Sequence, residues 1–150
     1  MIRVQEQAFD VGHEINAIKA GKPQIGGTAV FVGTVRDIND GADVLTLTLE
    51  HYPGMTEKAL ADIETEARDR WVLDDVLIVH RIGRMDVGED IVLVICCSEH
   101  RDNAFDACRF LMDYLKTRAP FWKLEKGSAE PKWVDARTSD DAAAARWAKK

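Results

Sequence analysis

Two kinds of hydrophobic pattern divide the chain into predicted strands and predicted helices. The segment VLTLTLEH (44–51) alternates strictly, with Leu45, Leu47 and Leu49 on one face and polar residues on the other, which predicts a half-buried strand. Continuous apolar or β-branched runs are typical of buried strands. Such runs predict further strands at Ile2–Gln5, TAVFVGTV (28–35), 76–82 and 91–97.

Between these strands, apolar residues recur at helical spacing. One stripe follows a turn at 52–54, has Thr56 as its predicted N-cap, and consists of Leu60, Ile63, Ala67 and Trp71. A later helix begins at His100 and ends near Arg118, because Pro120 lacks an amide donor and disfavours helix in the residue before it. The predicted apolar stripe of this helix consists of Ala104, Phe105, Cys108, Leu111, Met112 and Leu115.

The order of these elements predicts an α+β fold in one domain spanning residues 1–150. Two shorter helices, capped by Asp10 and by Ser139, complete the helices that flank a mixed or antiparallel sheet. A chain of 150 residues with 46% hydrophobic residues is long enough and apolar enough to bury a core. A cytoplasmic location is expected, since no apolar run is long enough to span a bilayer and the first ten residues contain no apolar signal core.

The charge distribution limits the kinds of ligand that the chain can bind. A net charge of −6 predicts that the chain as a whole repels nucleic acid and anionic membranes, so neither is expected as a partner. Any basic site must therefore be local. Basic residues recur where predicted elements begin or end, at Arg36, His100, Arg101, Lys116, Lys123 and Arg137. Sites are often assembled at such ends, which indicates a small phosphorylated or carboxylated ligand.

The densest group of cations surrounds the predicted helix end at Pro120. Lys116 falls in the last helical turn, and Lys123 lies in the segment beyond the proline. If that segment is a strand, Phe121 and Lys123 share one face while Trp122 lies on the other, so that one face can form a site. Lysines near a helix C-terminus are equally typical of a solvated surface that complements the helix dipole. A histidine at a helix start is likewise compatible with a simple cap, and both alternatives stay open.

Several strings in the chain resemble one known family. These strings are LEHYPGMTEKAL, HRIG, the pair His100-Arg101, MDYLKTRAPFWK and KWVDAR. Together they resemble, in order from about residue 27 to residue 147, the large catalytic subunit of molybdopterin synthase. The resemblance implies an α/β hammerhead-type fold and a homodimer of large subunits. It also implies a heterotetramer in which each large subunit carries a small ubiquitin-like sulfur-carrier subunit.

The same resemblance implies a sulfurtransferase of molybdenum cofactor biosynthesis. The family's reaction converts cyclic pyranopterin monophosphate to molybdopterin by adding two dithiolene sulfurs and opening the cyclic phosphate. The sulfurs come from the C-terminal Gly-Gly thiocarboxylate of the carrier, so the resemblance implies no metal and no cofactor. Carried over by position, Lys116 is expected beside the thiocarboxylate and Lys123 beside the pterin, both with catalytic roles. Expected substrate contacts are Phe31, Thr34, Val35, Arg36, His100, Arg101, Lys116, Lys123, Leu124, Glu125 and Arg137.

Three other hypotheses are kept beside this one, two of them from other functional classes. The chain could be a non-catalytic module that binds a phosphorylated pterin or nucleotide, or a scaffold that only holds the tail of the carrier. It could also be a sulfurtransferase that uses Cys96, Cys97 or Cys108. Against the last hypothesis, the cysteines include no spaced pair of the zinc or redox type and are typical of small core residues. Strand alternation also places Cys96 and Cys97 on opposite faces.

Overall fold

The computed structural model describes residues 1–39, 41–127, 130–134 and 138–148. Within these residues the helices are α1 (Val11–Lys19), α2 (Met55–Arg70), α3 (Arg101–Arg118) and α4 (Thr138–Ala145). The strands are β1 (Ile2–Gln5), β2 (Gly27–Thr34), β3 (Ile38–Asn39), β4 (Ala42–Asp43), β5 (Thr46–His51), β6 (Asp75–Arg81), β7 (Gly83–Asp86), β8 (Asp90–Ser98), β9 (Phe121–Lys126) and β10 (Lys132–Val134). None of the helices in this part of the chain is long and apolar enough to cross a membrane.

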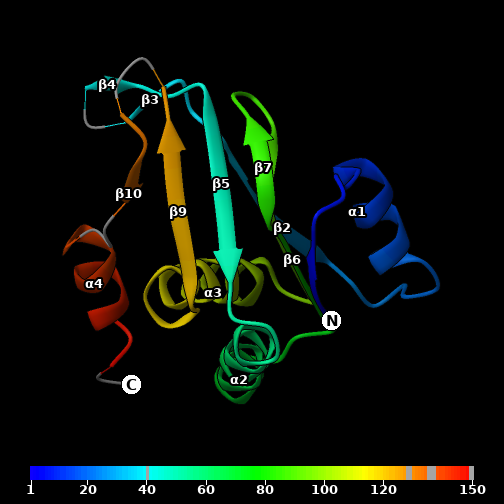
Figure 1. Cartoon of the computed structure of the whole chain (residues 1–150). Helices are drawn as coiled ribbons and strands as arrows, with labels where there is room; N and C mark the ends of the chain where they lie inside the picture. Colours follow the sequence, from blue (N-terminus) through cyan, green and yellow to red (C-terminus); the bar gives the residue numbers. More distant parts are fainter. Residues whose placement is uncertain (40, 128–129, 135–137, 149–150) are drawn as a thin grey trace.

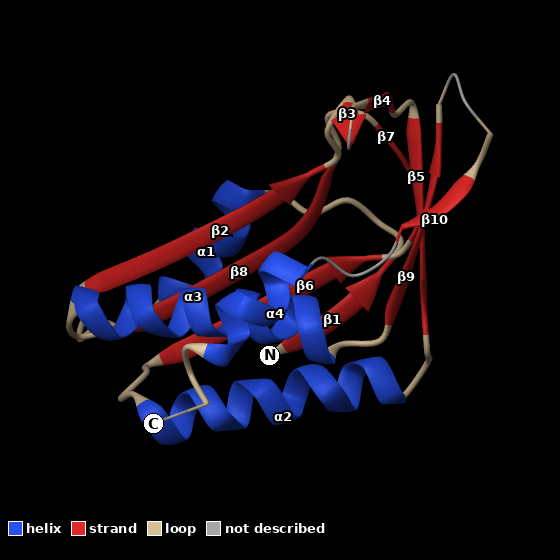
Figure 2. Ribbon diagram, turned by 90° about the vertical axis from the view of Figure 1, so that its left-hand side faces the viewer, coloured by secondary structure: helices blue, strands red, loops and turns tan. Residues whose placement is uncertain are grey.

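The first sheet has the strand order β1-β6-β8-β2 and lies between helices (Figures 1 and 2). Strand β1 pairs with β6 in parallel, while β6 with β8 and β8 with β2 are antiparallel. Helices α2 and α3 pack on one face, and α1 packs on the other. Because both faces are covered, the central strands β6 and β8 are almost continuously apolar. The predicted α+β fold with a mixed sheet and flanking helices is therefore confirmed.

Two hydrophobic cores lie on opposite faces of this sheet. One contains Ile63 and Phe110 from the helices, together with the strand residue Val94. The other contains Leu93 and Ile95, which pack against residues of α1 such as Ile15. The alternation of the strand places Cys96 in the first core and Cys97 in the second, as predicted.

The apolar face of α3 differs from its predicted stripe at one position. Phe105 was expected to be buried, but 64% of it is exposed. It lies about 100° around the helix from the buried Ala104, and this step carries it beyond the edge of the face that meets the sheet. Ala107 and Phe110, which were not in the predicted stripe, are fully buried.

The second sheet has the order β10-β9-β5-β7, is antiparallel throughout, and stands across the end of the first sheet (Figure 2). Its inner face carries Leu47, Leu49 and Met85, which form a small third core. Leu45 does not share this face, since it precedes β5 and is 62% exposed, while Val44 is buried in its place. This two-sheet arrangement is the hammerhead-type fold that the resemblance implies.

The corner at Pro120 is where α3, α2 and the second sheet meet. Helix α3 ends at Arg118 and β9 begins at Phe121, as the proline predicts. Thr56 was expected to cap α2, but Gly54 occupies the N-cap position and Thr56 lies buried in the first turn. The Thr56 hydroxyl accepts a hydrogen bond from the Tyr52 amide at 3.0 Å and donates one to the Pro120 carbonyl at 2.9 Å. The start of α2 is thereby tied to the joint between α3 and β9. The last helix, α4, includes Ser139 and begins at residue 138, so Ser139 is not its cap.

Candidate functional site

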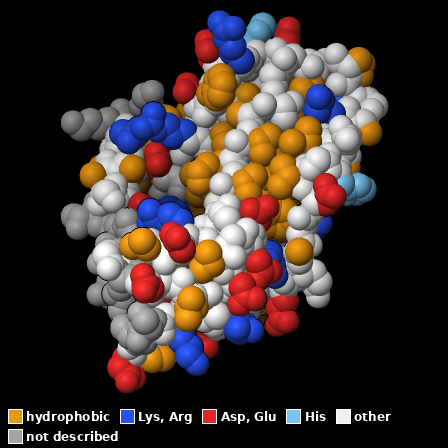
Figure 3. All heavy atoms as spheres, turned by 90° about the horizontal axis from the view of Figure 1, so that it is seen from above, with side chains coloured by type: hydrophobic (Ala, Val, Ile, Leu, Met, Phe, Trp, Pro, Cys, Tyr) orange, Lys and Arg blue, Asp and Glu red, His pale blue; other side chains and the backbone are white. Residues whose placement is uncertain are grey.

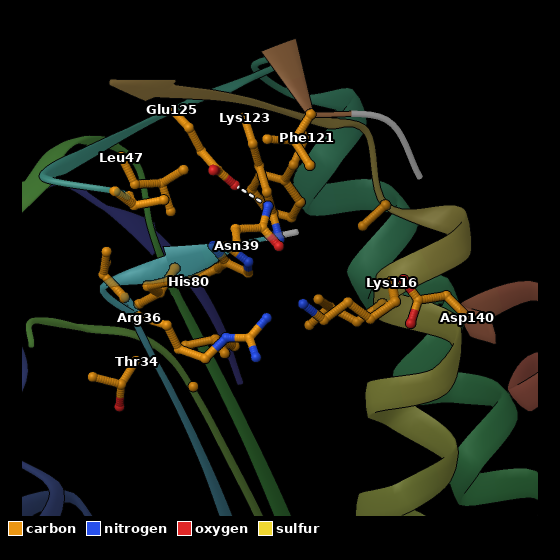
Figure 4. Close-up of a pocket in the computed structure, with 18 of the residues that line it drawn as sticks. Thr34, Arg36, Asn39, Leu47, His80, Lys116, Phe121, Lys123, Glu125 and Asp140 are labelled. Atoms are coloured by element: carbon orange, nitrogen blue, oxygen red, sulfur yellow. Dashed lines mark hydrogen bonds between the residues drawn. The ribbon is translucent and has the colours of Figure 1, made fainter. Parts of the chain in front are cut away.

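A cavity of about 390 Å³ opens where the two sheets and the C-terminal end of α3 meet (Figure 4). Its lining comes from segments that are far apart in the sequence, among them β2, β6, α3 and β9. In the space-filling view, Lys and Arg side chains lie on both sides of a hollow in the surface (Figure 3). The cavity is therefore a depression with a local positive charge on an acidic chain.

Three cations predicted from the sequence converge on this cavity. Arg36 follows the end of β2, Lys116 lies in the last turn of α3, and Lys123 lies on β9. Their side chains extend toward the same space from three directions (Figure 4). Lys116 is exposed at the mouth of the cavity, whereas Lys123 is partly buried. Such a set of amino and guanidinium groups can hold a phosphate or a carboxylate.

Four other predicted site residues also line the cavity, namely Phe31, Thr34, Val35 and Glu125. Val35 is buried in the small core of the second sheet. The Thr34 hydroxyl donates a hydrogen bond to Asp90 Oδ1 at 3.0 Å, which fixes the end of β2 beside the start of β8. This hydrogen bond anchors the chain just before Arg36, at the end of β2.

Among the described residues, three of the predicted site residues do not line the cavity. His100 and Arg101 lie at the start of α3, about 22 Å along the helix axis from Lys116 at 1.5 Å per residue. Both side chains are exposed. Leu124 does not line the cavity, since it alternates along β9 with the lining residues Lys123 and Glu125. Arg137 lies outside the described residues.

A buried carboxylate lies among the cations of the cavity. Glu125 on β9 is 9% exposed, and its Oε1 accepts a hydrogen bond from the side-chain amide of Asn39 on β3 (Figure 4). Within the described part of the chain, Glu125 Oε2 is buried and has no hydrogen-bond partner. Asn39 was not predicted as a site residue, because it lies in a polar connection that the sequence pattern describes only as a turn.

A neutral histidine forms part of the cavity wall. His80 on β6 is 4% exposed and stacks on Phe121 with ring centroids 3.9 Å apart. Its Nδ1 lies 2.9 Å from the Arg81 carbonyl oxygen, so Nδ1 carries the proton and donates it. Burial, followed by the charges of Lys123 and Lys116, outweighs this hydrogen bond and lowers the pKa of His80 to about 3. His80 is therefore uncharged at neutral pH, and its Nε2 is an acceptor.

His80 was also missed by sequence reasoning. It lies within a strand that is apolar on both sides, where a histidine is typical of the core. The available signal was the string HRIG, which begins with His80 and is one of the strings that resemble the family.

Taken together, the cavity offers cations at its mouth, a stacked aromatic wall, and a buried acceptor. It suits an organic anion that contains a flat ring with N–H donors. Within the described residues there is no group of three or more His, Cys, Asp or Glu side chains placed to hold a metal ion.

Comparison with known proteins places the chain among close relatives. The model of the "MoaE protein" family matches residues 4–118. The chain is 60% identical over 146 residues to the "Molybdopterin synthase catalytic subunit" of Pseudomonas aeruginosa, covering 97% of each chain. The same name is carried by a protein of Escherichia coli K12 that is 53% identical over 146 residues, again with 97% of each chain covered.

A solved structure of "Molybdopterin biosynthesis MoaE protein" from Burkholderia ambifaria superposes with a TM-score of 0.84 at 53% identity. The match covers 98% of this chain and 97% of that one. Both the sequence and the fold therefore agree over nearly the whole length, and the chain belongs to the MoaE family, the catalytic subunits of molybdopterin synthase.

Proposed function

We propose that this cavity is where cyclic pyranopterin monophosphate receives its two dithiolene sulfurs and becomes molybdopterin. The observation that carries the proposal is the convergence of Arg36, Lys116 and Lys123 on one cavity of an acidic chain. Arg36 comes from the end of a strand, Lys116 from a helix end, and Lys123 from the strand that follows. A phosphorylated ligand is attracted to such a group, and the wall formed by Phe121 and His80 suits its flat ring.

The two lysines would divide the chemistry according to their depth. Lys116 is exposed at the mouth, where the thiocarboxylate tail of a second protein can reach it. There its ammonium group stabilises negative charge on the thiocarboxylate and on the oxyanion that forms when water releases the carrier's acyl group from the transferred sulfur. Lys123 is partly buried beside the aromatic wall, and it acts on the pterin as acid, base or electrostatic stabiliser. Each transfer forms a bond between sulfur and a carbon of the substrate and breaks a carbon–oxygen bond at that carbon, with the oxygen leaving either on the phosphate as the cyclic phosphate opens or as water. Water then cleaves the bond between sulfur and the acyl carbon, which leaves the sulfur on the substrate as a thiolate and the carrier with a carboxylate.

The proposed partner is a small ubiquitin-like carrier whose C-terminal Gly-Gly ends in a thiocarboxylate. Two glycines lack side chains, so such a tail can enter a narrow opening and adopt conformations closed to other residues. The whole chain, residues 1–150, would act as one large-subunit domain in the cytoplasm. It would form a homodimer and, with two carriers, a heterotetramer.

The homodimer gives a role to His100 and Arg101, which are exposed at the end of α3 remote from Lys116. In a pair of subunits they would contribute to the cavity of the neighbour, where they bind substrate together with that subunit's lysines. Leu124 and Arg137 complete the set of proposed substrate contacts.

The cysteine-based hypothesis has no support in the geometry of the cavity. Cys96, Cys97 and Cys108 are all buried, and none of them lines the cavity. A thiol nucleophile needs access to its substrate, and these three lie in the cores that hold the first sheet and α3 together.

The test is a single-turnover assay with cyclic pyranopterin monophosphate and thiocarboxylated carrier. Wild type and Lys126→Ala are expected to yield dithiolene product, since Lys126 is an exposed lysine of β9 that does not line the cavity. Lys116→Ala is expected to give no product while pterin binding stays largely intact, because Arg36 and Lys123 remain in the cavity to hold the anion. Equal losses of binding and turnover in Lys116→Ala would favour a binding module instead. No product from wild type with a loaded and bound carrier would refute the proposal.

A further inference from the structure

The hairpin formed by β3 and β4 brings one polar side chain into the cavity. Strand β3 contains only Ile38 and Asn39, and the hairpin turns back at Gly41, whose φ of 78° suits a glycine. Ile38 is 51% exposed, whereas Asn39 is 8% exposed and lines the cavity. The alternation of this short strand thus directs Asn39 inward, toward β9.

Asn39 determines which way the carboxylate of Glu125 faces. Its amide Nδ2 donates to Glu125 Oε1, and the two side chains come from segments 86 residues apart. A neutral amide can fix a carboxylate in this way and leave its negative charge in place. A lysine or an arginine in the same position would neutralise that charge. The second oxygen, Oε2, is left buried and without a partner in the described part of the chain.

Glu125 lines the cavity, and the unpartnered oxygen of its carboxylate calls for a donor from the ligand. Leaving a buried acceptor unsatisfied costs free energy, and such groups in folded proteins usually have a partner or a function. Lys116, Lys123 and Arg36 can serve the anionic parts of a ligand, but an anion gains nothing from a nearby carboxylate. Glu125 therefore recognises a different part of the ligand, one that carries N–H donors.

We propose that Asn39 is a positioning residue that turns Glu125 so that Oε2 accepts hydrogen bonds from the adjacent N–H groups of the pterin ring. This inference rests on the proposed function, and it adds how the site distinguishes a pterin ring from a related ring such as a lumazine. A pterin carries an amino group beside a ring N–H, and this pair of donors matches a carboxylate. A lumazine has a carbonyl in place of the amino group and would bring an acceptor toward Oε2.

The experiment compares two ligands in wild type, Asn39→Leu and Glu125→Gln. The ligands are a 6-substituted pterin monophosphate and the lumazine with the same side chain, and binding is measured by quenching of ligand fluorescence. Wild type should prefer the pterin by about tenfold or more, as expected for a hydrogen bond to a charged acceptor. In both variants the preference should fall to less than about threefold. Competition by inorganic phosphate should remain within about twofold of wild type in all three proteins.

Two controls separate positioning from a purely structural role. Ile38→Ala changes the exposed neighbour of Asn39 on the same hairpin and should keep the full preference for the pterin. If Asn39→Leu fails to fold, as judged by its thermal transition, Asn39→Ala and Glu125→Gln supply the same comparison.

A variant of Asn39 that folds and still prefers the pterin by tenfold would overturn the inference. So would a parallel loss of pterin, lumazine and phosphate binding, because that pattern indicates collapse of the cavity. These results differ from failure of the proposed function, which would appear as wild type that binds the pterin monophosphate but yields no dithiolene product.

Discussion

The folded protein should lose stability on the acid side of neutrality, because His80 takes up a proton there in the unfolded chain but not in the folded protein. His80 is buried against Phe121, and the charges of Lys123 and Lys116, with a smaller contribution from His51, disfavour its protonated form. Its pKa of about 3 in the folded protein lies below the value of about 6.5 expected in the unfolded chain. Between these two values the unfolded state binds more protons, so stability falls as the pH falls.

The size of the effect follows from the two pKa values. At pH 5 the unfolded His80 is almost fully protonated while the folded one is still neutral, which corresponds to about 2 kcal/mol of lost stability relative to pH 7.5. At pH 5 the size of this loss is set almost entirely by the pKa of His80 in the unfolded chain. Other groups contribute at lower pH, among them Glu66, whose pKa is lowered by its hydrogen bond with Arg118. These groups contribute equally to the pH dependence of wild type and of a variant that lacks only His80, so their contribution cancels when the two proteins are compared.

The assay is urea unfolding at pH 7.5, 6 and 5 for wild type, His80→Gln and His13→Gln. His80→Gln should be less stable than wild type at pH 7.5, since it loses the stacking on Phe121. Its further loss between pH 7.5 and 5 should be smaller than that of wild type by about 2 kcal/mol. His13 is exposed on α1, so His13→Gln should keep the pH dependence of wild type. Parallel pH profiles for wild type and His80→Gln would refute the reasoning.

Two further predictions concern residues away from the cavity. In Gly26→Ala the new Cβ would fall inside contact distance of the Glu99 carbonyl oxygen, so unfolding should become easier by about 2 kcal/mol, whereas Gly12→Ala in α1 should lose nothing. Thermal denaturation checks this pair, and an undiminished melting temperature for Gly26→Ala would contradict it. Replacing Cys96, Cys97 and Cys108 by serine should leave single-turnover sulfur transfer per folded molecule unchanged, since the three thiols are buried and burial raises the pKa of Cys97. Loss of transfer in folded protein would restore a role for a thiol.

The parts of the site that could be predicted are those governed by local rules. Pro120 ends α3 whatever the tertiary contacts around it. The two-residue period of the following strand then places Lys123 on the same face as Phe121. The places of His80 and Asn39 in the site depend on contacts between segments that are distant in the sequence. The first is hidden in an apolar run, and the second acquires its place only when the hairpin meets β9.

The same distinction explains the errors in the predicted elements. Strand β7 has the sequence GRMD, which carries little strand pattern, and it is a strand because it pairs with β5. Leu45 follows the alternation of its segment, yet its side chain is exposed and that of Val44 is buried. The Leu45 amide donates to the Lys126 carbonyl and the Leu45 carbonyl accepts from the Val87 amide, so contacts with β9 and with the residue after β7 set its orientation. In each case the outcome was set by a neighbour that the local pattern does not reveal.

The joint between α3 and β9 also limits how this region of the chain can change in length. Lys116 and Lys123 stand on either side of Pro120, whose carbonyl is held by the buried Thr56 hydroxyl. One residue inserted between Pro120 and Lys123 would shift the strand by half its period and turn the lysine away from the cavity, toward the face that now carries Trp122. Insertions and deletions in this region should therefore be confined to the connection beyond β9. The spacing of seven residues between Lys116 and Lys123 should stay constant.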